Sequence, residues 1–261
     1  MTRTSVVTGA ASGIGAAVVA LLEARGDRVI GVDLAGAEVT ADLATAEGRA
    51  SMVEQVADLA DGRVDAVVAN AGVLAEDTGA IVRVNYFGAV ATLTGLRPLL
   101  ALGEAPRAVA TASAALLKDY DEGLVERCLA GAEADALAWA EQQGLHPVRT
   151  YASTKRALAR WVRASSVAPD WAGAGIALNA VAPGVVRTPM TAELLADAAT
   201  AELLLELVPM PYGGVTTTAP VAALLAFLAS AEVGAVTGQV VFADGGGECL
   251  EQGDDVWGQR G

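Results

Sequence analysis

The sequence is poor in the residues that several common kinds of functional site require. It has one histidine and two cysteines, and 17 basic side chains stand against 31 acidic ones, for a net charge of −14. A single histidine excludes a zinc site built on several histidines, and a Ser-His-Asp hydrolase would depend on His146 alone. The shortage of lysine and arginine argues against nucleic acid as a partner. We therefore expect neither a metal nor a nucleic acid.

Long apolar runs and domain linkers are also missing. No uninterrupted apolar run approaches the ~18 residues needed to cross a bilayer, and the first apolar stretch is too short for a signal peptide. Cys128 and Cys249 are far apart and match no metal-binding or redox spacing, so we expect both to be reduced. No composition break divides residues 1–261. These absences predict a cytoplasmic protein of one domain that does not bind a membrane.

A glycine-rich turn lies between the first predicted strand, residues 3–7, and the first predicted helix, residues 16–25. It reads Thr8-Gly9-Ala10-Ala11-Ser12-Gly13-Ile14-Gly15. Such glycines allow a tight turn and let a pyrophosphate approach the backbone N–H groups at the start of the helix. Because any tight turn needs glycine, it is the position between strand and helix that indicates a dinucleotide site.

An acidic residue follows the next strand at a spacing typical of dinucleotide-binding units. The strand spans residues 28–32, and Asp33 comes eighteen residues after Gly15. A carboxylate there binds the adenosine ribose hydroxyls and repels a 2′-phosphate. No lysine or arginine lies in the glycine turn or directly after Asp33, so the sequence favours NAD over NADP. The alternative is that Asp33 is an ordinary turn residue at the end of a strand.

The alternation of strands and helices continues after Asp33. Residues 39–43 are predicted as a short strand, and Asp42 within it is placed near the adenine. Residues 45–60 are predicted as a helix with Thr45 as its N-cap. This pattern is typical of a parallel sheet with helices between its strands.

Polar residues follow two further predicted strands. The apolar run 65–69 suits a strand buried on both faces, and it ends in Asn70-Ala71-Gly72, at the edge of the sheet where ligands bind. A long helical region carries Asn85, and the strand 108–112 ends in Ser113. On their own, Asn85 and Ser113 are equally compatible with a polar helix residue and a strand-end cap.

Tyr151 and Lys155 lie four residues apart in a helical stretch, so their side chains share one helix face. A fixed positive charge near a phenol favours the phenolate, and we expect Lys155 to lower the pKa of Tyr151. A tyrosine tuned in this way takes a proton from an alcohol or returns one to a ketone. The alternative is a chance pair on the surface.

Together these motifs, in this order, resemble the short-chain dehydrogenase/reductase family along nearly the whole chain. The resemblance implies a doubly wound Rossmann-type α/β domain with a parallel seven-stranded sheet, helices on both faces, and NAD as cofactor. It implies a catalytic tetrad of Asn85, Ser113, Tyr151 and Lys155. It implies that the cofactor is bound by Thr8, Gly9, Ser12, Gly13, Ile14, Gly15, Asp33, Asp42, Leu43, Asn70, Ala71, Gly72, Tyr151, Lys155, Pro183, Gly184, Val186 and Thr188. One departure is Ala69, where many members have a second asparagine, and we expect a modest loss of hydrogen bonding there.

A second departure is the long connection between Ser113 and Tyr151, which are 38 positions apart instead of the family's usual short distance. Residues 116–148 carry an acidic and apolar pattern that predicts a small helical insertion. This insertion resembles the bacterial 3α-hydroxysteroid dehydrogenase/carbonyl reductase branch of the family. The alternative is an unrelated insertion in an ordinary member.

The segment 185–214 is predicted to cover the substrate, with one apolar helix over 191–208. Its apolar side chains suit an apolar substrate, although helical spacing also fits core packing; they are Met190, Leu194, Leu195, Leu203, Leu204 and Met210. A helix over 220–229 and a last strand over 239–243 complete the fold, and the polar tail 253–261 is expected to be loose.

These predictions lead to an NAD-dependent oxidoreductase that interconverts a secondary alcohol and a ketone, with a hydroxysteroid or another apolar carbonyl compound as substrate. Two alternatives remain open. One is an alcohol dehydrogenase acting on terpene or aromatic alcohols, and the other is a dinucleotide-binding regulator without turnover.

The insertion also leads to an expectation about assembly. In many family members the helices that carry the tetrad Asn and Tyr pair across a four-helix interface, and an insertion next to Tyr151 would obstruct it. We expect a homodimer formed through residues 220–229 and 239–243 instead.

Overall fold

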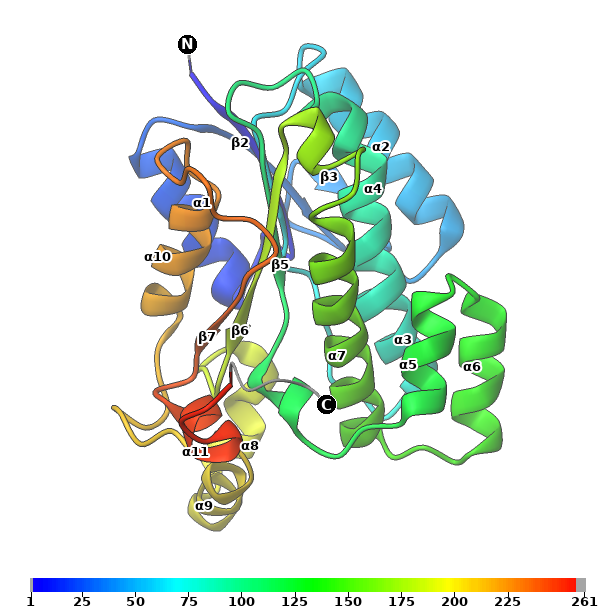
Figure 1. Ribbon diagram of the computed structural model, residues 1–261, viewed down its shortest axis with the longest axis vertical. Coiled ribbons are helices and arrows are strands. Elements are labelled where there is room, and N and C mark those ends of the chain that lie inside the picture. Colours follow the sequence, from blue (N-terminus) through cyan, green and yellow to red (C-terminus); the bar gives the residue numbers. More distant parts are fainter. Residues whose placement is uncertain (1, 257–261) are drawn as a thin grey trace.

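The computed structural model describes residues 2–256, which form a central parallel sheet covered by helices on both faces (Figure 1). Within those residues the sheet has seven strands in the order β3-β2-β1-β4-β5-β6-β7, and every neighbouring pair is parallel. The strands are β1 (Thr4–Thr8), β2 (Arg28–Asp33), β3 (Val39–Thr40), β4 (Ala66–Ala69), β5 (Arg107–Thr111), β6 (Ala177–Pro183) and β7 (Val240–Ala243). The order reverses between β1 and β4, so the loops after these strands diverge and leave a crevice at their carboxyl ends.

Helices α2, α4 and α7 lie on one face of the sheet, and α1 and α10 lie on the other (Figure 1). The helices are α1 (Gly13–Ala24), α2 (Ala46–Leu59), α3 (Thr78–Val82), α4 (Ala89–Leu100), α5 (Glu122–Leu129), α6 (Glu133–Gln142), α7 (Pro147–Ser165), α8 (Ala192–Ala196), α9 (Ala198–Leu207), α10 (Thr218–Leu228) and α11 (Gly247–Gln252). The predicted doubly wound α/β fold is therefore confirmed.

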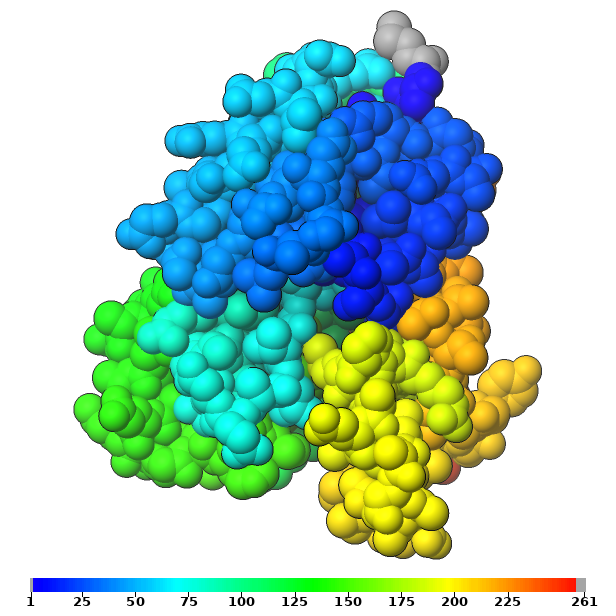
Figure 2. Space-filling model, turned by 180° about the vertical axis from the view of Figure 1, so that it is seen from behind, coloured from blue at the N-terminus to red at the C-terminus, as the bar shows by residue number. Residues whose placement is uncertain are grey.

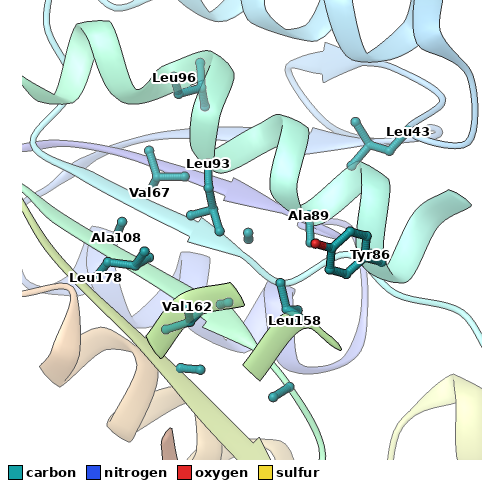
Figure 3. Close-up of a cluster of buried hydrophobic side chains, with 14 of the residues drawn as sticks. Leu43, Val67, Tyr86, Ala89, Leu93, Leu96, Ala108, Leu158, Val162 and Leu178 are labelled. Carbon is teal, nitrogen blue, oxygen red and sulfur yellow. The ribbon is translucent and has the colours of Figure 1, made fainter. Parts of the chain in front are cut away.

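Two hydrophobic clusters hold the layers together, one on each face of the sheet. In the first, Leu93 of α4 and Leu158 of α7 lie over Val67 of β4 (Figure 3), and all three are fully buried. In the second, Val68 of β4 packs with Leu225 of α10. Successive residues of a strand point to opposite faces, which explains why β4 reads as a continuous apolar run.

The predicted helical insertion is confirmed as a helical pair, α5 and α6, that packs against α7 and α3 (Figure 1). Asp121 caps α5 by accepting the Leu124 N–H at 2.8 Å, and it also accepts the indole N–H of Trp139 from α6 at 2.8 Å. Arg49 of α2 forms an ion pair with Glu133 of α6 at 2.6 Å. The insertion is thus fastened to the body of the protein at both of its helices.

Predicted element boundaries were correct where local signals were strong. Thr45 caps α2 as expected, accepting the Gly48 N–H at 3.0 Å. His146, the single histidine, caps α7 by accepting the Val148 N–H at 3.3 Å. Tyr151 consequently lies in the second turn of this helix and not at its start.

The single helix predicted over residues 191–208 is wrong. Asp197 has an extended backbone and separates α8 from α9, because its carboxylate accepts the N–H of Thr200 at 2.8 Å and starts a new helix. The C-terminal helix α11 was not predicted, and the carboxylate of Asp244 accepts the Glu248 N–H in its first turn at 2.7 Å. Most of the tail, residues 257–261, lies outside the described residues. None of the described helices is both long and apolar enough to span a bilayer.

Candidate active site

A cleft runs along the carboxyl ends of the central strands, and most of the predicted site residues line it. Figure 2 shows the surface hollowed between the blue N-terminal segment, the cyan segment and the yellow segment that holds α8 and α9. Predicted residues in the lining are Gly9, Ser12, Gly13, Ile14, Asp33, Asp42, Leu43, Asn70, Ala71, Gly72, Ser113, Tyr151, Lys155, Pro183, Gly184, Val186 and Thr188. Thr8, Gly15 and Asn85 lie behind this surface, where they support it.

The glycine turn between β1 and α1 has the shape that a pyrophosphate requires. Gly9 and Gly13 have positive φ values of 68° and 55°, a conformation that side chains disfavour. A Cβ on Gly15 would lie 1.9 Å from the Gly9 carbonyl oxygen, so only glycine lets the helix begin this close to the turn. Ser12 makes no side-chain cap to α1, which leaves the first N–H groups of the helix free for an anion. These residues fit a dinucleotide.

Asp33 ends β2 with both carboxylate oxygens engaged by backbone. They accept the N–H of Ala11 at 2.9 Å and the N–H of Leu34 at 2.7 Å. The carboxylate therefore holds the glycine turn against β2 and places a negative charge at the far end of the cleft. Asp42, two residues after the end of β3, accepts the Ala44 N–H at 2.9 Å, and this short turn explains why β3 stops before its predicted end.

Asn70 ties the two strands on either side of β4 together at the switch point. Its backbone N–H donates to Thr8 Oγ1 at 3.0 Å, its side-chain amide donates to the Thr8 carbonyl at 3.2 Å, and its Oδ1 accepts the Thr111 hydroxyl at 3.1 Å. Ala69 is buried and belongs to the hydrophobic cluster around α4 and α7. The expected loss of hydrogen bonding at Ala69 stays a prediction.

Asn85 lies in a π-helical turn, Arg83–Gly88, that joins α3 to α4. Its side chain accepts the Val73 N–H at 2.7 Å and donates to the Val73 carbonyl at 2.8 Å, and it is fully buried. The predicted tetrad member thus holds the segment after Gly72 and does not face the cleft. Its part in a proton path stays a prediction.

Ser113, Tyr151 and Lys155 meet at the centre of the cleft. Ser113 follows β5 and starts the 3₁₀ turn η2 (Ala114–Leu117), while Tyr151 and Lys155 project from successive turns of α7. Ser113 lies close enough to Tyr151 for its hydroxyl to lower the pKa of the phenol, which is the effect of a hydrogen bond. The Lys155 ammonium lies 5.7 Å from the centre of the Tyr151 ring and donates to the Thr111 carbonyl at 2.8 Å.

Burial dominates the electrostatics of this pair. It lowers the pKa of Lys155 to about 8, because the ammonium is taken out of water. It raises the pKa of Tyr151, and the hydrogen bond from Ser113 only partly opposes that rise. The expectation that the pKa of Tyr151 lies below its ordinary value is therefore wrong for the protein by itself, because burial of the phenol raises that pKa.

The remaining predicted residues follow β6. Thr188 lies next to the glycine turn, since a Cβ on Gly13 would be 3.4 Å from the Thr188 side chain. Gly184 is crowded by Met210, whose sulfur would lie 2.8 Å from a Cβ at that position. Sequence reasoning missed Thr111, which binds Lys155. Thr111 lies two residues before Ser113 at the end of β5, so the sequence could place it at this edge of the sheet. The sequence could not predict its contact with Lys155.

Comparisons with known proteins agree with this geometry. The family model described as short chain dehydrogenase matches residues 3–125, and the one described as Enoyl-(Acyl carrier protein) reductase matches residues 136–248. The chain is 37% identical over 246 residues to the 3-alpha-hydroxysteroid dehydrogenase/carbonyl reductase of Comamonas testosteroni, which covers 92% of this chain and 95% of the relative. This chain belongs to the short-chain dehydrogenase/reductase family. The unmatched residues, 126–135, lie in the insertion and run from the second half of α5 to the start of α6.

Other members of the family extend the comparison. The cis-4-hydroxycyclohexanecarboxylate dehydrogenase of Sinomonas cyclohexanicum is 32% identical over 94% of this chain and 96% of its own length. The crystal structure of the 3-alpha-hydroxysteroid dehydrogenase from Pseudomonas sp. B-0831 complexed with NADH matches with a TM-score of 0.89 at 39% identity, covering 97% of this chain and 100% of that one. The chain is thus an oxidoreductase acting on alcohols and ketones, and a nicotinamide dinucleotide is its cofactor.

Proposed function

We propose that this short-chain dehydrogenase/reductase interconverts an apolar secondary alcohol, of the hydroxysteroid kind, and its ketone with NAD(H). The observation that carries the proposal is the meeting of Ser113, Tyr151 and Lys155 in one cleft beside the glycine turn. Each supplies a different chemical group to the same place, namely a neutral donor, a transferable proton and a cation.

Tyr151 is the acid–base residue in this proposal. As a phenolate it accepts the proton of the alcohol O–H, and as a phenol it returns that proton to the ketone oxygen. Ser113, whose hydroxyl lowers the pKa of Tyr151, holds the substrate oxygen within reach. When bound, the nicotinamide supplies the acceptor or donor of the hydride.

Lys155 supports Tyr151 in two ways. One of its three N–H bonds is taken by the Thr111 carbonyl, which leaves two for the nicotinamide ribose and for solvent. Its charge also favours the phenolate over the phenol, although burial of Tyr151 opposes this. The family resemblance assigns the ribose contact to this lysine.

The cofactor preference rests on Asp33. Both of its oxygens are held by backbone N–H groups, so the carboxylate stays at the adenosine end of the cleft with lone pairs left for ribose hydroxyls. A 2′-phosphate at that place would meet a like charge. NAD is therefore the preferred form.

The apolar substrate is supported by the segment that closes the cleft. Met190 lines the cleft and is 43% exposed, and Leu203 and Leu207 of α9 are 56% and 57% exposed. No residue of α8 or α9 is buried, so the leucines of these helices lie outside the hydrophobic core, whereas Met190 and Thr191 before them line the cleft. The names of two relatives, a hydroxysteroid dehydrogenase and a dehydrogenase of a cyclohexane alcohol, support a cyclic alcohol.

A screen of NADH oxidation over steroid ketones, quinones and small aromatic ketones tests this function. We expect the fastest turnover with a steroid ketone, and we expect Tyr151→Phe to abolish it while NADH binding persists. Turnover that survives in Tyr151→Phe would overturn the assignment of the acid–base. A protein that binds NADH and turns over none of the panel would favour the alternative of a regulator.

We also propose a homodimer and a cytoplasmic location. The insertion helix α5 packs along α7, which supports an obstructed four-helix interface. Among residues 2–256, β7 is the edge strand of the sheet with no further strand beside it, and Phe227 of α10 is 47% exposed. The location is supported by free cysteines, one of them the buried Cys128 with its pKa raised to about 12 by burial.

A further inference from the structure

Helix α7 carries a second polar stripe besides the one that holds Tyr151 and Lys155. The stripe consists of Arg149, Ser153, Arg156 and Arg160, whose spacings of four, three and four residues place them along one helix face. Its members lie about 120–180° around the helix from the mean direction of Tyr151 and Lys155. The stripe therefore points away from the cofactor cleft and toward the insertion.

Three members of the stripe bind the segment from Ser113 to Asp121, which we name the arm. The Arg156 guanidinium donates to the Leu116 carbonyl at 3.1 Å and lies 4.1 Å from the centre of the Tyr120 ring. The Ser153 hydroxyl accepts the Asp121 N–H at 2.9 Å. Arg149 donates to the Tyr120 carbonyl at 3.2 Å, so the end of the arm is fixed to α7 before the insertion begins.

Arg160, the last member, binds beyond the arm. Its guanidinium pairs with Glu122 at 2.7 Å and Glu126 at 3.0 Å, both on α5. Arg156 and Arg160 thus bind different segments. Arg156 holds the chain that contains Ser113, and Arg160 holds only the insertion.

The position of the arm affects the site because Ser113 is its first residue. The Ser113 hydroxyl must lie close to the Tyr151 hydroxyl for both to contact the substrate oxygen. In this chain the connection from Ser113 to Tyr151 contains two added helices, so the short connection typical of the family cannot set the distance between the two side chains. The hydrogen bonds from α7 to Leu116 and Asp121 attach the arm directly to the helix that carries Tyr151. They therefore fix the distance between Ser113 and Tyr151 without relying on the long covalent connection.

We propose that Arg156 is a positioning residue for the reaction, which holds the turn η2 so that the Ser113 hydroxyl stays at the Tyr151 hydroxyl. Arg156 itself contacts neither of the two side chains. The inference rests on the proposed roles of Ser113 and Tyr151. Arg156 follows Lys155 in the sequence but does not line the cleft, so the proposal gives a function to a residue outside the cleft.

The test compares Arg156→Met with Arg160→Met, a matched control on the same stripe. Alcohol oxidation is measured with NAD and the fastest of androsterone, cyclohexanol and 1-phenylethanol. We expect Arg156→Met to lower kcat about tenfold with the KM for NAD unchanged, since a misplaced donor affects chemistry more than cofactor binding. The pH midpoint of kcat should move upward, because Ser113 lowers the pKa of Tyr151 and that effect is lost when its hydroxyl is displaced. Arg160→Met should change neither.

The conservative variant Arg156→Lys separates positioning from general packing. It can still donate to the Leu116 carbonyl, so we expect it to recover most of the lost kcat and to return the pH midpoint, whereas Arg156→Gln should recover less. If Arg156→Met does not fold, kcat and the pH midpoint are compared between Arg156→Lys and Arg156→Gln instead. The proposal is overturned if Arg156→Met keeps kcat and the midpoint of the unaltered protein, or if Arg160→Met reproduces both changes.

Failure of this inference is distinguishable from failure of the proposed function. Ser113→Ala and Tyr151→Phe are measured beside the arginine variants. If these two lose turnover and Arg156→Met does not, only the positioning role is wrong. If Tyr151→Phe retains turnover, the assignment of the acid–base is wrong whatever the arginine variants show.

Discussion

Replacing Lys155 with methionine should make the protein more stable at neutral pH while it removes activity. Lys155 is 3% exposed, and burial lowers its pKa from 10.5 to about 8. Each pKa unit corresponds to about 1.4 kcal/mol, so keeping the ammonium charged inside the protein opposes folding by about 3 kcal/mol at pH 7. A methionine side chain of similar length carries no such penalty.

Part of this gain is lost again at the Thr111 carbonyl. Lys155 donates to that oxygen at 2.8 Å, and leaving it without this donor costs about 1–2 kcal/mol. The net stabilisation at pH 7 is therefore about 1–2 kcal/mol, which for a chain of this size raises the Tm by about 2–8 °C. NAD binding should weaken in the same variant, since the proposed contact to the nicotinamide ribose is removed.

The pH dependence of the difference in Tm is the decisive measurement. Because the folded-state pKa lies below the unfolded value, the penalty is complete below pH about 8 and disappears as the pH rises toward 10.5. Thermal unfolding at one protein concentration, from pH 7 to pH 10, should show the advantage of Lys155→Met shrinking with pH. Lys118→Met is the control, because Lys118 is partly exposed and paired with Glu251. A variant less stable than the unaltered protein at pH 7, or a constant difference, would refute the reasoning.

Three further predictions address the cofactor, the proton transfer and the assembly. Asp33→Ala should narrow the preference for NAD over NADP in a fluorescence titration, and an unaltered protein that prefers NADPH would disprove the role of Asp33. The rate of alcohol oxidation should rise with pH as Tyr151 loses its proton, and Ser113→Ala should move the midpoint higher, because the Ser113 hydrogen bond lowers the pKa of Tyr151. Light scattering should report a dimer, whereas a stable tetramer would contradict the proposed obstruction by α5.

Much of the fold could be predicted from short stretches of sequence. Thr45 marks the start of α2 because its side chain caps a backbone N–H only three residues away, and the apolar run before Asn70 marks β4 because a strand buried on both faces needs apolar residues throughout. Where local signals compete, prediction failed. Asp197 was interpreted as one residue of a helix, although it also caps the helix that follows it.

The sequence by itself determined which chemical groups the site contains and in which order they come, because motifs such as Tyr151 and Lys155 on one helix face depend only on neighbouring residues. The tertiary structure alone decided their energetics. Burial of Tyr151 reverses the direction expected for its pKa, and the contacts of Lys155 with Thr111 and of Arg156 with Leu116 join segments about 40 residues apart in the chain. Desolvation depends on how many atoms the whole fold packs around a group, and no local pattern of residues carries that information.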